Sequence, residues 1–485
     1  MPPNIARGGS LVSLDNRVLR VFGDLAVDKK LARLEVVSRL PRFIAEYLIS
    51  RYQRSEDREW TVRLARIVEE YYPDPRDKDR VLSKAKREGR ITLIDEFKAT
   101  VDLKRNMYFL HIPNLQIHDA LVNETLISQY ERILSGLWGI GVLEYMPTLV
   151  TAARPRGRDK IFFTPLILEE FEPFQVYNID LNTFIEGRYE FSTWEWIDLL
   201  IKSIGLNPSV YDLRQKLLLL FRLVPLIEGN VNLMELGPRA TGKTYLYRNT
   251  SYYTRIYAGG TVSAARLFYD MRLKVLGDLG TRDVVVFDEI ARVKFTNPDE
   301  VVAKLKDYMV DGFFERGTLK RAHSDCSLVF MGNIELGEGG VLGSIINYLP
   351  VFMRETALID RIHGLLPGWE LPKIMRSDVH LATGYGLAVD YLSEILHRMR
   401  TRSFEPLVEQ SIELIGDYTI RDEKAVKKLL SGMLKLVFPH GEFDRSELLD
   451  IANLAVELRQ KVVDVLSEMS PSEFPRKRLS MRVIS

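Results

Sequence analysis

The stretch that decides the fold is residues 232–244, which read Asn232-Leu233-Met234-Glu235-Leu236-Gly237-Pro238-Arg239-Ala240-Thr241-Gly242-Lys243-Thr244. Its second half fits the pattern G-x-x-x-x-G-K-[ST], in which glycines let the backbone turn tightly enough to aim several N–H groups at phosphate oxygens. An apolar run precedes the glycines and helix-compatible residues follow them. We therefore predict a buried strand, a phosphate-binding loop, and a helix whose positive N-terminal end faces the phosphates.

The residue types of this loop predict ATP and Mg²⁺ as cofactors. Lys243 would reach the β- and γ-phosphates, and the hydroxyl of Thr244 would coordinate Mg²⁺. The backbone of the remaining positions would hold the phosphate chain; these are Gly237, Pro238, Arg239, Ala240, Thr241 and Gly242.

A second apolar run, residues 284–287, ends in Asp288 and Glu289. Acidic residues at the end of a strand place carboxylates at the carboxyl edge of a parallel sheet, where such sheets bind their ligands. We expect Asp288 to hold Mg²⁺ through water, together with Thr244, and Glu289 to polarise the attacking water. A helix N-terminal turn is the alternative for this acidic pair.

Three further residues complete the expected ATP site. Asn333 ends a third apolar run, and its amide would orient the water near the γ-phosphate; a turn-forming asparagine is the alternative. Arg361 would reach the γ-phosphate of a neighbouring subunit in a ring, with Arg354 as the competing candidate and a local ion pair as the other explanation. Arg421 opens an amphipathic helical stretch and would contact nucleotide in its own chain or lie on a solvated face.

Length and composition limit the class of protein. The chain has 485 residues, enough for about three folding units. Its net charge of +1 excludes a uniformly basic nucleic-acid coat but allows a local basic surface. The single cysteine, Cys326, cannot form an internal disulfide. Because we find no apolar run of about 20 residues and no signal region, we expect a soluble, cytoplasmic protein without a membrane partner.

The order of helix and strand patterns predicts three parts. Residues 1–190 are expected to form an α+β N-terminal domain, which is a candidate for contact with DNA. Residues 191–372, in which short apolar runs alternate with helical patterns, are expected to form an α/β ATPase core with a parallel sheet. Residues 373–485 are expected to form an α-helical lid and C-terminal helices.

Taken together, these motifs resemble the AAA+ ATPase plan, and more narrowly the BrxL family, the Lon-like AAA+ proteins of BREX phage-defence systems. The matching sequence motifs include Gly259-Gly260-Thr261-Val262, Lys306-Asp307-Tyr308-Met309, Asp360-Arg361-Ile362-His363 and Pro367-Gly368-Trp369-Glu370-Leu371-Pro372-Lys373. The resemblance implies a homo-oligomeric ring, hexameric or heptameric and in some forms stacked as a double ring, that binds duplex DNA and works with other defence proteins. Family members also carry a protease-like domain after the lid; with no room for one before Ser485, we expect no protease activity from this chain.

Two basic stretches are the expected DNA contacts. Residues 312–321 suit a hairpin ahead of the Asn333 strand, and its cations would touch phosphates without reading sequence. A second loop is interrupted by proline and glycine. A solvated surface is the alternative for both stretches. The cations concerned are Arg316, Lys320 and Arg321 in the first, and Arg154, Arg156, Arg158 and Lys160 in the second, with Arg266, Arg272 and Lys274 as a further candidate for a pore loop.

These expectations combine into a ring-forming ATPase that encircles DNA and couples ATP hydrolysis to translocation or remodelling in phage defence. One alternative is a polypeptide unfoldase that works with a separate peptidase, for which Leu267-Phe268-Tyr269 would supply an aromatic–hydrophobic pore contact. A second alternative is a DNA-binding scaffold that does not hydrolyse ATP. The presence of both Asp288 and Glu289 argues against that scaffold.

Overall fold

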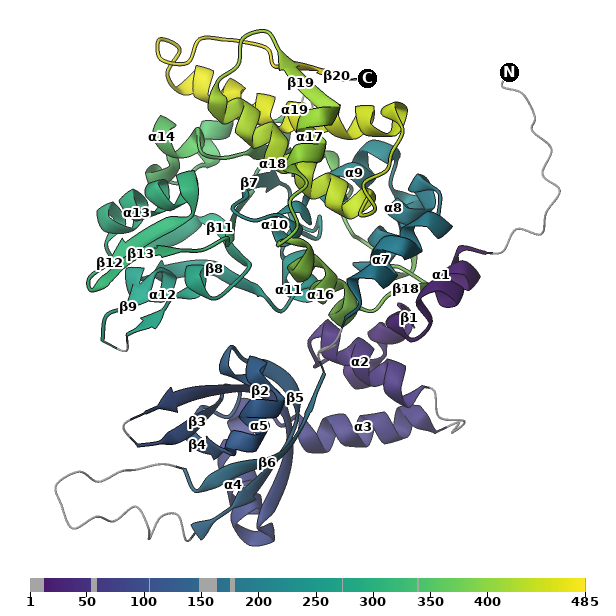
Figure 1. Ribbon diagram of the computed structural model, residues 1–485, viewed down its shortest axis with the longest axis vertical. Helices are drawn as coiled ribbons and strands as arrows, with labels where there is room; N and C mark the ends of the chain where they lie inside the picture. Colours follow the sequence, from purple (N-terminus) through teal and green to yellow (C-terminus); the bar gives the residue numbers. More distant parts are fainter. Residues whose placement is uncertain are drawn as a thin grey trace. The chain divides into compact units, whose positions relative to one another are not determined.

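The computed structural model describes residues 13–53, 59–103, 105–147, 164–174, 179–272, 274–337 and 340–484. The chain forms two compact units (Figure 1). One unit holds Leu31–Ile179, and the other holds Met1–Lys30 together with Asp180–Ser485. The expected core and lid therefore belong to one unit, which also includes the start of the chain. This division differs from the expected three parts, in which residues 1–190 stood together.

A five-stranded parallel sheet forms the centre of the larger unit, in the order β17-β7-β14-β11-β8. Every neighbouring pair is parallel, which confirms the sheet expected for the core. Residues 284–287 and 328–331 are fully buried, because parallel strands are covered on both faces. The strands are β7 (Asn232–Gly237), β8 (Thr254–Val262), β11 (Val284–Phe295), β14 (Ser327–Asn333) and β17 (Gly364–Pro367).

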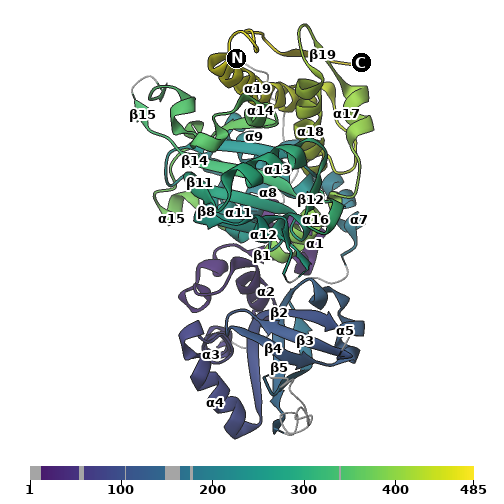
Figure 2. The same cartoon turned by 90° about the vertical axis from the view of Figure 1, so that its left-hand side faces the viewer.

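Helices before and between these strands pack around the sheet (Figure 2). They are α7 (Leu181–Gly187), α8 (Thr193–Ser203), α9 (Leu213–Phe221), α10 (Val224–Ile227), α11 (Lys243–Thr250), α12 (Ala264–Leu267), α13 (Pro298–Asp311) and α14 (Thr356–Ile359). Two short antiparallel pairs interrupt them, β9 (Tyr269–Asp270) with β10 (Val275–Leu276), and β12 (Phe313–Arg316) with β13 (Leu319–His323). A third small pair is β15 (Leu336–Gly337) with β16 (Gly340–Val341).

The start of the chain joins the larger unit through a strand pairing. After α1 (Leu14–Phe22), β1 (Ala26–Asp28) pairs antiparallel with β18 (Tyr385–Leu387). The buried ammonium of Lys29 donates a hydrogen bond to the carbonyl oxygen of Leu387 at 2.6 Å. These backbone and side-chain bonds explain why residues up to Lys30 do not belong with the unit that follows them in sequence.

The lid is mainly helical, but it also contains strands that the expected helices did not include: β18, which pairs with β1, and one antiparallel pair near the end of the chain. Its helices are α15 (Ser377–His380), α16 (Val389–Met399), α17 (Glu405–Ser411), α18 (Ile420–Val437) and α19 (Arg445–Met469). Between and after them, β19 (Ile412–Ile415) pairs antiparallel with β20 (Ser480–Val483).

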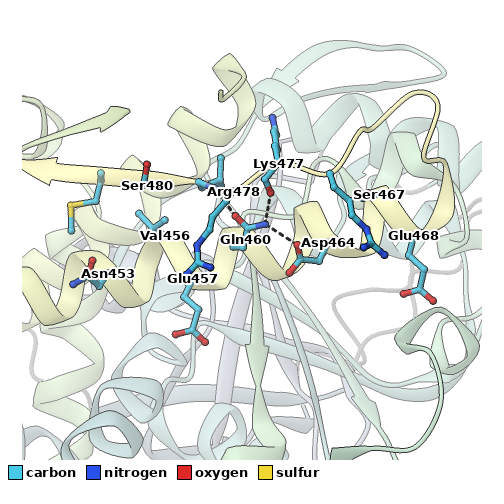
Figure 3. Close-up of a pocket in the computed structure, with 13 residues that line it drawn as sticks. Asn453, Val456, Glu457, Gln460, Asp464, Ser467, Glu468, Lys477, Arg478 and Ser480 are labelled. Carbon is cyan, nitrogen blue, oxygen red and sulfur yellow. Dashed lines mark hydrogen bonds between the residues drawn. The ribbon is translucent and has the colours of Figure 1, made fainter. Parts of the chain in front are cut away.

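The segment after α19 folds back along that helix and encloses a hollow of about 1040 Å³ with it (Figure 3). The side-chain amide of Gln460 donates to the carbonyl oxygen of Lys477 at 3.0 Å and accepts from the backbone N–H of Leu479 at 2.6 Å. One side chain of α19 therefore holds the returning segment at two points.

The smaller unit is a closed five-stranded barrel with helices α2 (Arg42–Tyr52), α3 (Trp60–Tyr71) and α4 (Lys78–Glu88) before it. The strands are β2 (Arg90–Asp102), β3 (Met107–Ile112), β4 (Ile117–Val122), β5 (Leu137–Tyr145) and β6 (Leu166–Pro173), closed in the order β2-β3-β4-β6-β5. All neighbours are antiparallel except β4 and β6, and α5 (Glu124–Gln129) connects β4 to β5. This five-stranded Greek-key barrel has the connectivity of an OB fold.

Candidate ATP site

The predicted phosphate-binding loop lies between β7 and α11, at the carboxyl edge of the parallel sheet. Ala240 and Gly242 both have positive φ, +67° and +78°, which is the backbone geometry such a loop needs. A side chain at Gly237 would come within 2.6 Å of the backbone of Gly368, so only glycine fits there. The backbone N–H of Ile374 also donates to the carbonyl oxygen of Ala240 at 2.7 Å. The segment after β17 therefore packs against the loop and fixes it.

Lys243 lies folded against this loop. Its ammonium donates to the carbonyl oxygens of Gly237 at 2.9 Å and Pro238 at 2.7 Å, and the residue is 7% exposed. Burial lowers the pKa of this ammonium, while the carboxylates of Glu235 and Asp288 oppose that effect. The sequence expectation placed Lys243 at the phosphates, and the structure places its charge within the loop that would bind them.

Thr244 and Asp288 meet although they are far apart in sequence. The hydroxyl of Thr244 donates to Oδ2 of Asp288 at 2.6 Å, and Asp288 is buried. Oxygen ligands of this type suit Mg²⁺. The two residues that the sequence assigned to the metal are therefore brought together by the pairing of β7, β14 and β11.

Glu289 sits in an irregular part of β11. Asp288 pairs with Ala258 and Val293 pairs with Gly260, so the residues between Asp288 and Val293 bulge out of the ladder. Within this bulge Glu289 has a φ of +48°, which is unusual for a residue with a side chain. Its carboxylate forms an ion pair with Arg292 at 3.1 Å. The bulge turns this carboxylate away from the direction that a regular strand would give it.

Asn333 and Arg354 lie on the same side of the sheet as the loop. Asn333 is exposed at the end of β14 and pairs in register with Gly237. Both Asn333 and Arg354 line a hollow of about 1010 Å³, whose apolar wall includes Phe295 and Phe352. Arg354 also donates to the carbonyl oxygen of Leu349 at 2.9 Å.

Arg361 and Arg421 lie at the opposite, amino edge of the sheet. The carbonyl oxygen of Arg361 accepts from the side chain of Asn232 at 3.0 Å, where β7 begins, and Arg421 is paired with Asp360. The six residues of β7 span about 20 Å between this edge and the phosphate loop. The expected contact of Arg421 with nucleotide in its own chain is therefore not what the structure shows.

An ion-pair chain connects this edge to the end of the lid. Arg459 is paired with Asp360 at 2.9 Å and with Asp422 at 2.8 Å, and Lys477 is paired with Asp422 at 2.6 Å. Burial works to raise the pKa of Asp422, but Arg459, Lys477 and Thr419 lower it to about 2. Asp422 is therefore ionised at neutral pH and holds both cations.

Two charged residues beneath the loop were missed by the sequence interpretation. Arg222 and Glu235 are fully buried and form a two-point ion pair at 2.6 and 3.0 Å. A further nitrogen of Arg222 donates to the carbonyl oxygen of Thr241, within the loop, at 2.9 Å. The signal was present: Glu235 interrupts an apolar strand and Arg222 follows a run of leucines, and buried charges must be paired.

The expected hairpin is formed by β12 and β13 around Gly317, which has a φ of +58°. Arg316 is largely buried there, paired with Glu300 at 3.2 Å and bonded to the carbonyl oxygen of Tyr269 at 2.6 Å. Lys320 and Arg321 are exposed, and the guanidinium of Arg321 lies over a phenylalanine ring of the same hairpin. Two of the three expected contact residues are therefore accessible to a ligand.

The other expected DNA contacts lie partly outside the described residues and partly on α12 and the turn between β9 and β10. Arg154, Arg156, Arg158 and Lys160 lie outside the described residues, between β5 and β6. Arg266 lies over the ring of Tyr257, and Arg272 and Lys274 belong to the exposed turn between β9 and β10.

Comparisons with known proteins also indicate an ATPase domain in the larger unit. The model for the ATPase domain of Lon-like protease BrxL-like proteins matches residues 166–480, and the model for the N-terminal part of the BREX system Lon protease-like protein BrxL matches residues 20–145. The chain is 32% identical to the Lon-like protease BrxL of Escherichia coli O9:H4 (strain HS) over 95% of its length. It is 32% identical to the Lon-like protease BrxL of Bacillus cereus (strain H3081.97) over 93%. It spans 66% of the length of each relative. Among the described helices, none is both long and apolar enough to cross a bilayer.

Proposed function

Because the chain belongs to the BrxL family of Lon-like proteins from BREX systems, we propose that it is a ring-forming AAA+ ATPase. In this proposal the ring encircles DNA and couples ATP hydrolysis to translocation or remodelling during phage defence. The observation that supports it best is the meeting of Lys243, Thr244 and Asp288 at one edge of the parallel sheet.

In this proposal each group of the candidate site has a separate role. The loop N–H groups and Lys243 would bind the phosphates, and the oxygens of Thr244 and Asp288 would hold Mg²⁺, which would supply positive charge to offset that of the β- and γ-phosphates. Glu289 orients and polarises the attacking water once its carboxylate leaves Arg292. Asn333, in register with the first glycine of the loop, holds that water near the γ-phosphate.

A ring accounts for the position of Arg361. This residue precedes β17 at the edge of the sheet opposite to the loop, so it faces away from the ATP site of its own chain. Its Nε is buried and finds no hydrogen-bond partner within the described residues. In a ring, one subunit's Arg361 edge meets the next subunit's loop edge, and the arginine stabilises charge at the neighbour's γ-phosphate. Arg421, paired with the adjacent Asp360, would approach the same neighbour.

The exposed cations Lys320 and Arg321 are the proposed DNA contacts on the hairpin, acting on phosphates rather than on bases. Arg316 supports the hairpin from within. The ring would contain six or seven copies of the chain, in some states as two stacked rings, and would act with other proteins of the same defence system.

The polypeptide unfoldase is the second candidate function, and one observation weighs against its pore contact. Leu267 and Phe268 are fully buried and Tyr269 is 8% exposed, so these side chains are not presented to a polypeptide.

The deciding experiment measures ATP turnover of the purified chain alone, with duplex DNA and with an unfolded protein, alongside Glu289→Gln. Particle size is followed in the same samples. We expect duplex DNA to change turnover or assembly, and Glu289→Gln to retain bound ATP without turning it over. Stimulation by unfolded protein alone would replace the DNA motor with the unfoldase. Unchanged turnover in Glu289→Gln would remove Glu289 from its role.

A further inference from the structure

The outer face of the barrel carries a cluster that the ATP site does not use. β2, β3 and β4 are consecutive neighbours in the barrel (Figure 2), and they correspond to the first three strands of an OB fold. OB folds bind oligonucleotides and oligosaccharides on the face of their second and third strands, which are β3 and β4 here. The chemistry of this face therefore indicates which ligand it accepts.

The register of β2 and β3 determines which side chains lie outside the barrel. Ala99 pairs with Leu110, and both are buried in the barrel core. Because side chains alternate along a strand, the flanking pairs face outward. These pairs are Lys98 with His111 and Thr100 with Phe109. The outer face thus presents an aromatic ring and an imidazole side by side on β3.

Two further contacts extend this cluster. His118, exposed on β4, has its ring 6.0 Å from that of His111, and Thr100 is hydrogen-bonded to His111 at 3.1 Å. Burial, and then the neighbouring His118 and Lys98, lower the pKa of His111. The imidazole ring is planar, so it offers a flat surface beside the ring of Phe109.

Two cations, Lys98 and Arg105, and two carboxylates, Asp102 and Asp119, surround the rings. The guanidinium of Arg105, in the turn between β2 and β3, lies 5.7 Å from the centre of the Phe109 ring. Asp102 is paired with Arg105 at 3.3 Å, and Asp119 accepts from Thr164 at 2.6 Å while its charge opposes the lowering of the His111 pKa. A phosphate at Arg105 would therefore compete with Asp102, and the flat rings contribute more to the choice of ligand than the local charge does. Cations beside flat rings are the combination that binds unpaired nucleotides, because every base has a face for stacking and every linkage has a phosphate.

We propose that this face binds single-stranded DNA, with bases stacked on Phe109, His111 and His118 and with Lys98 and Arg105 at the phosphates. This proposal rests on the proposed function as a DNA-binding ATPase. It adds that one of the DNA ligands is single-stranded. A duplex does not fit these rings, because its bases are already stacked on one another and present only their edges. Recognition is independent of sequence, since stacking is available to every base.

The test measures binding of the full chain to a fluorescently labelled oligo-dT of about 12 nucleotides, a length suited to one OB fold. A duplex and an oligo-rU of equal length serve as comparisons. Phe109→Leu keeps apolar bulk but removes the ring, whereas Phe109→Tyr keeps the ring. Lys98→Ala removes a proposed phosphate contact, and Lys86→Ala, on the exposed side of α4, is its matched control.

We expect Phe109→Leu to weaken binding of oligo-dT about tenfold, Phe109→Tyr to bind like the parent, and Lys98→Ala to weaken binding more than Lys86→Ala. Duplex binding should change less than twofold in all four variants. Equal loss of single-strand and duplex binding, or no loss in Phe109→Leu, would overturn the proposal, and tighter binding of oligo-rU would overturn the choice of DNA. If Phe109 governs oligo-dT binding while duplex DNA leaves turnover unchanged, the ring function fails and this assignment stands.

Discussion

The buried ion pair of Arg222 and Glu235 offers a way to separate the folding of the ATP site from its affinity for ATP. Glu235→Gln leaves the guanidinium of Arg222 charged, fully buried and without a counter-charge. Removing one partner of a buried pair costs about 3–5 kcal/mol. That is a large fraction of the about 5–15 kcal/mol that keeps a domain folded. The variant should therefore unfold at a much lower urea concentration than the parent.

The double variant Arg222→Met, Glu235→Leu should behave differently. Apolar side chains of similar volume replace a buried pair at little or no cost, so the free energy of unfolding should return to within about 1 kcal/mol of the parent. The hydrogen bond from Arg222 to the carbonyl oxygen of Thr241 is still lost. A hydrogen bond from a charged donor contributes about 1.5–3 kcal/mol, and if half of this holds the loop in its binding shape, ATP affinity falls about three- to tenfold.

Urea unfolding followed by circular dichroism and titration with a fluorescent ATP analogue measure the two quantities. The control is Arg214→Met, whose ion pairs with Glu370 and Glu457 are half-exposed and should contribute less than about 1 kcal/mol. A double variant as unstable as Glu235→Gln would contradict the pairing argument. Parental ATP affinity in the double variant would show that Arg222 does not position the loop.

Three further outcomes follow from the structure. Arg292→Ala frees Glu289 from an exposed ion pair, so basal ATP turnover should rise by up to about fivefold, and a fall would contradict a restraining role. Arg361→Ala and Lys243→Ala should each abolish turnover, while random 1:1 mixing should restore about a quarter of the sites; an inactive mixture would contradict action between subunits. Burial raises the pKa of Asp95, inside the barrel, to about 7, so the folded state holds this proton more tightly than the unfolded state. Barrel stability should therefore fall by about 4 kcal/mol as pH rises from about 4 to about 7, and Asp95→Asn should abolish that dependence in urea unfolding at each pH.

The candidate ATP site was predictable where its signal is local in sequence. The glycines of the loop from Gly237 to Thr244, at fixed spacing, predict its turn. Asp288 and Glu289 are recognisable because they are acidic residues at the end of an apolar run. Their meeting in space followed from one rule, that parallel strands end at the same edge of a sheet. The sequence therefore predicted which residues meet at this edge, although not the bulge that turns Glu289.

What was missed depends on pairings between distant segments. The barrel closes through β4 and β6, and the lid gains strands because residues near 413 meet residues near 482. The alternating pattern of each strand gives no information about its partner. The position of Arg421 relative to the sheet could not be predicted for the same reason. The sequence pattern predicts its helix, but the edge of the sheet at which Arg421 lies is set by the packing of α18 beside β17 and by the ion pair with Asp360.

The ion-pair chain from Lys477 through Asp422 and Arg459 to Asp360 has a thermodynamic consequence. Coupling between two sites is reciprocal, so an event that favours the folded-back position of the segment after α19 must favour the arrangement around Asp360 by the same factor. Conversely, if the proposed ring forms, engagement of Arg361 or Arg421 by a neighbouring subunit would change how firmly that segment is held. In the proposed ring, the tail of the lid would thus be energetically linked to assembly, and a ligand that captured Lys477 would act as an effector of that ring.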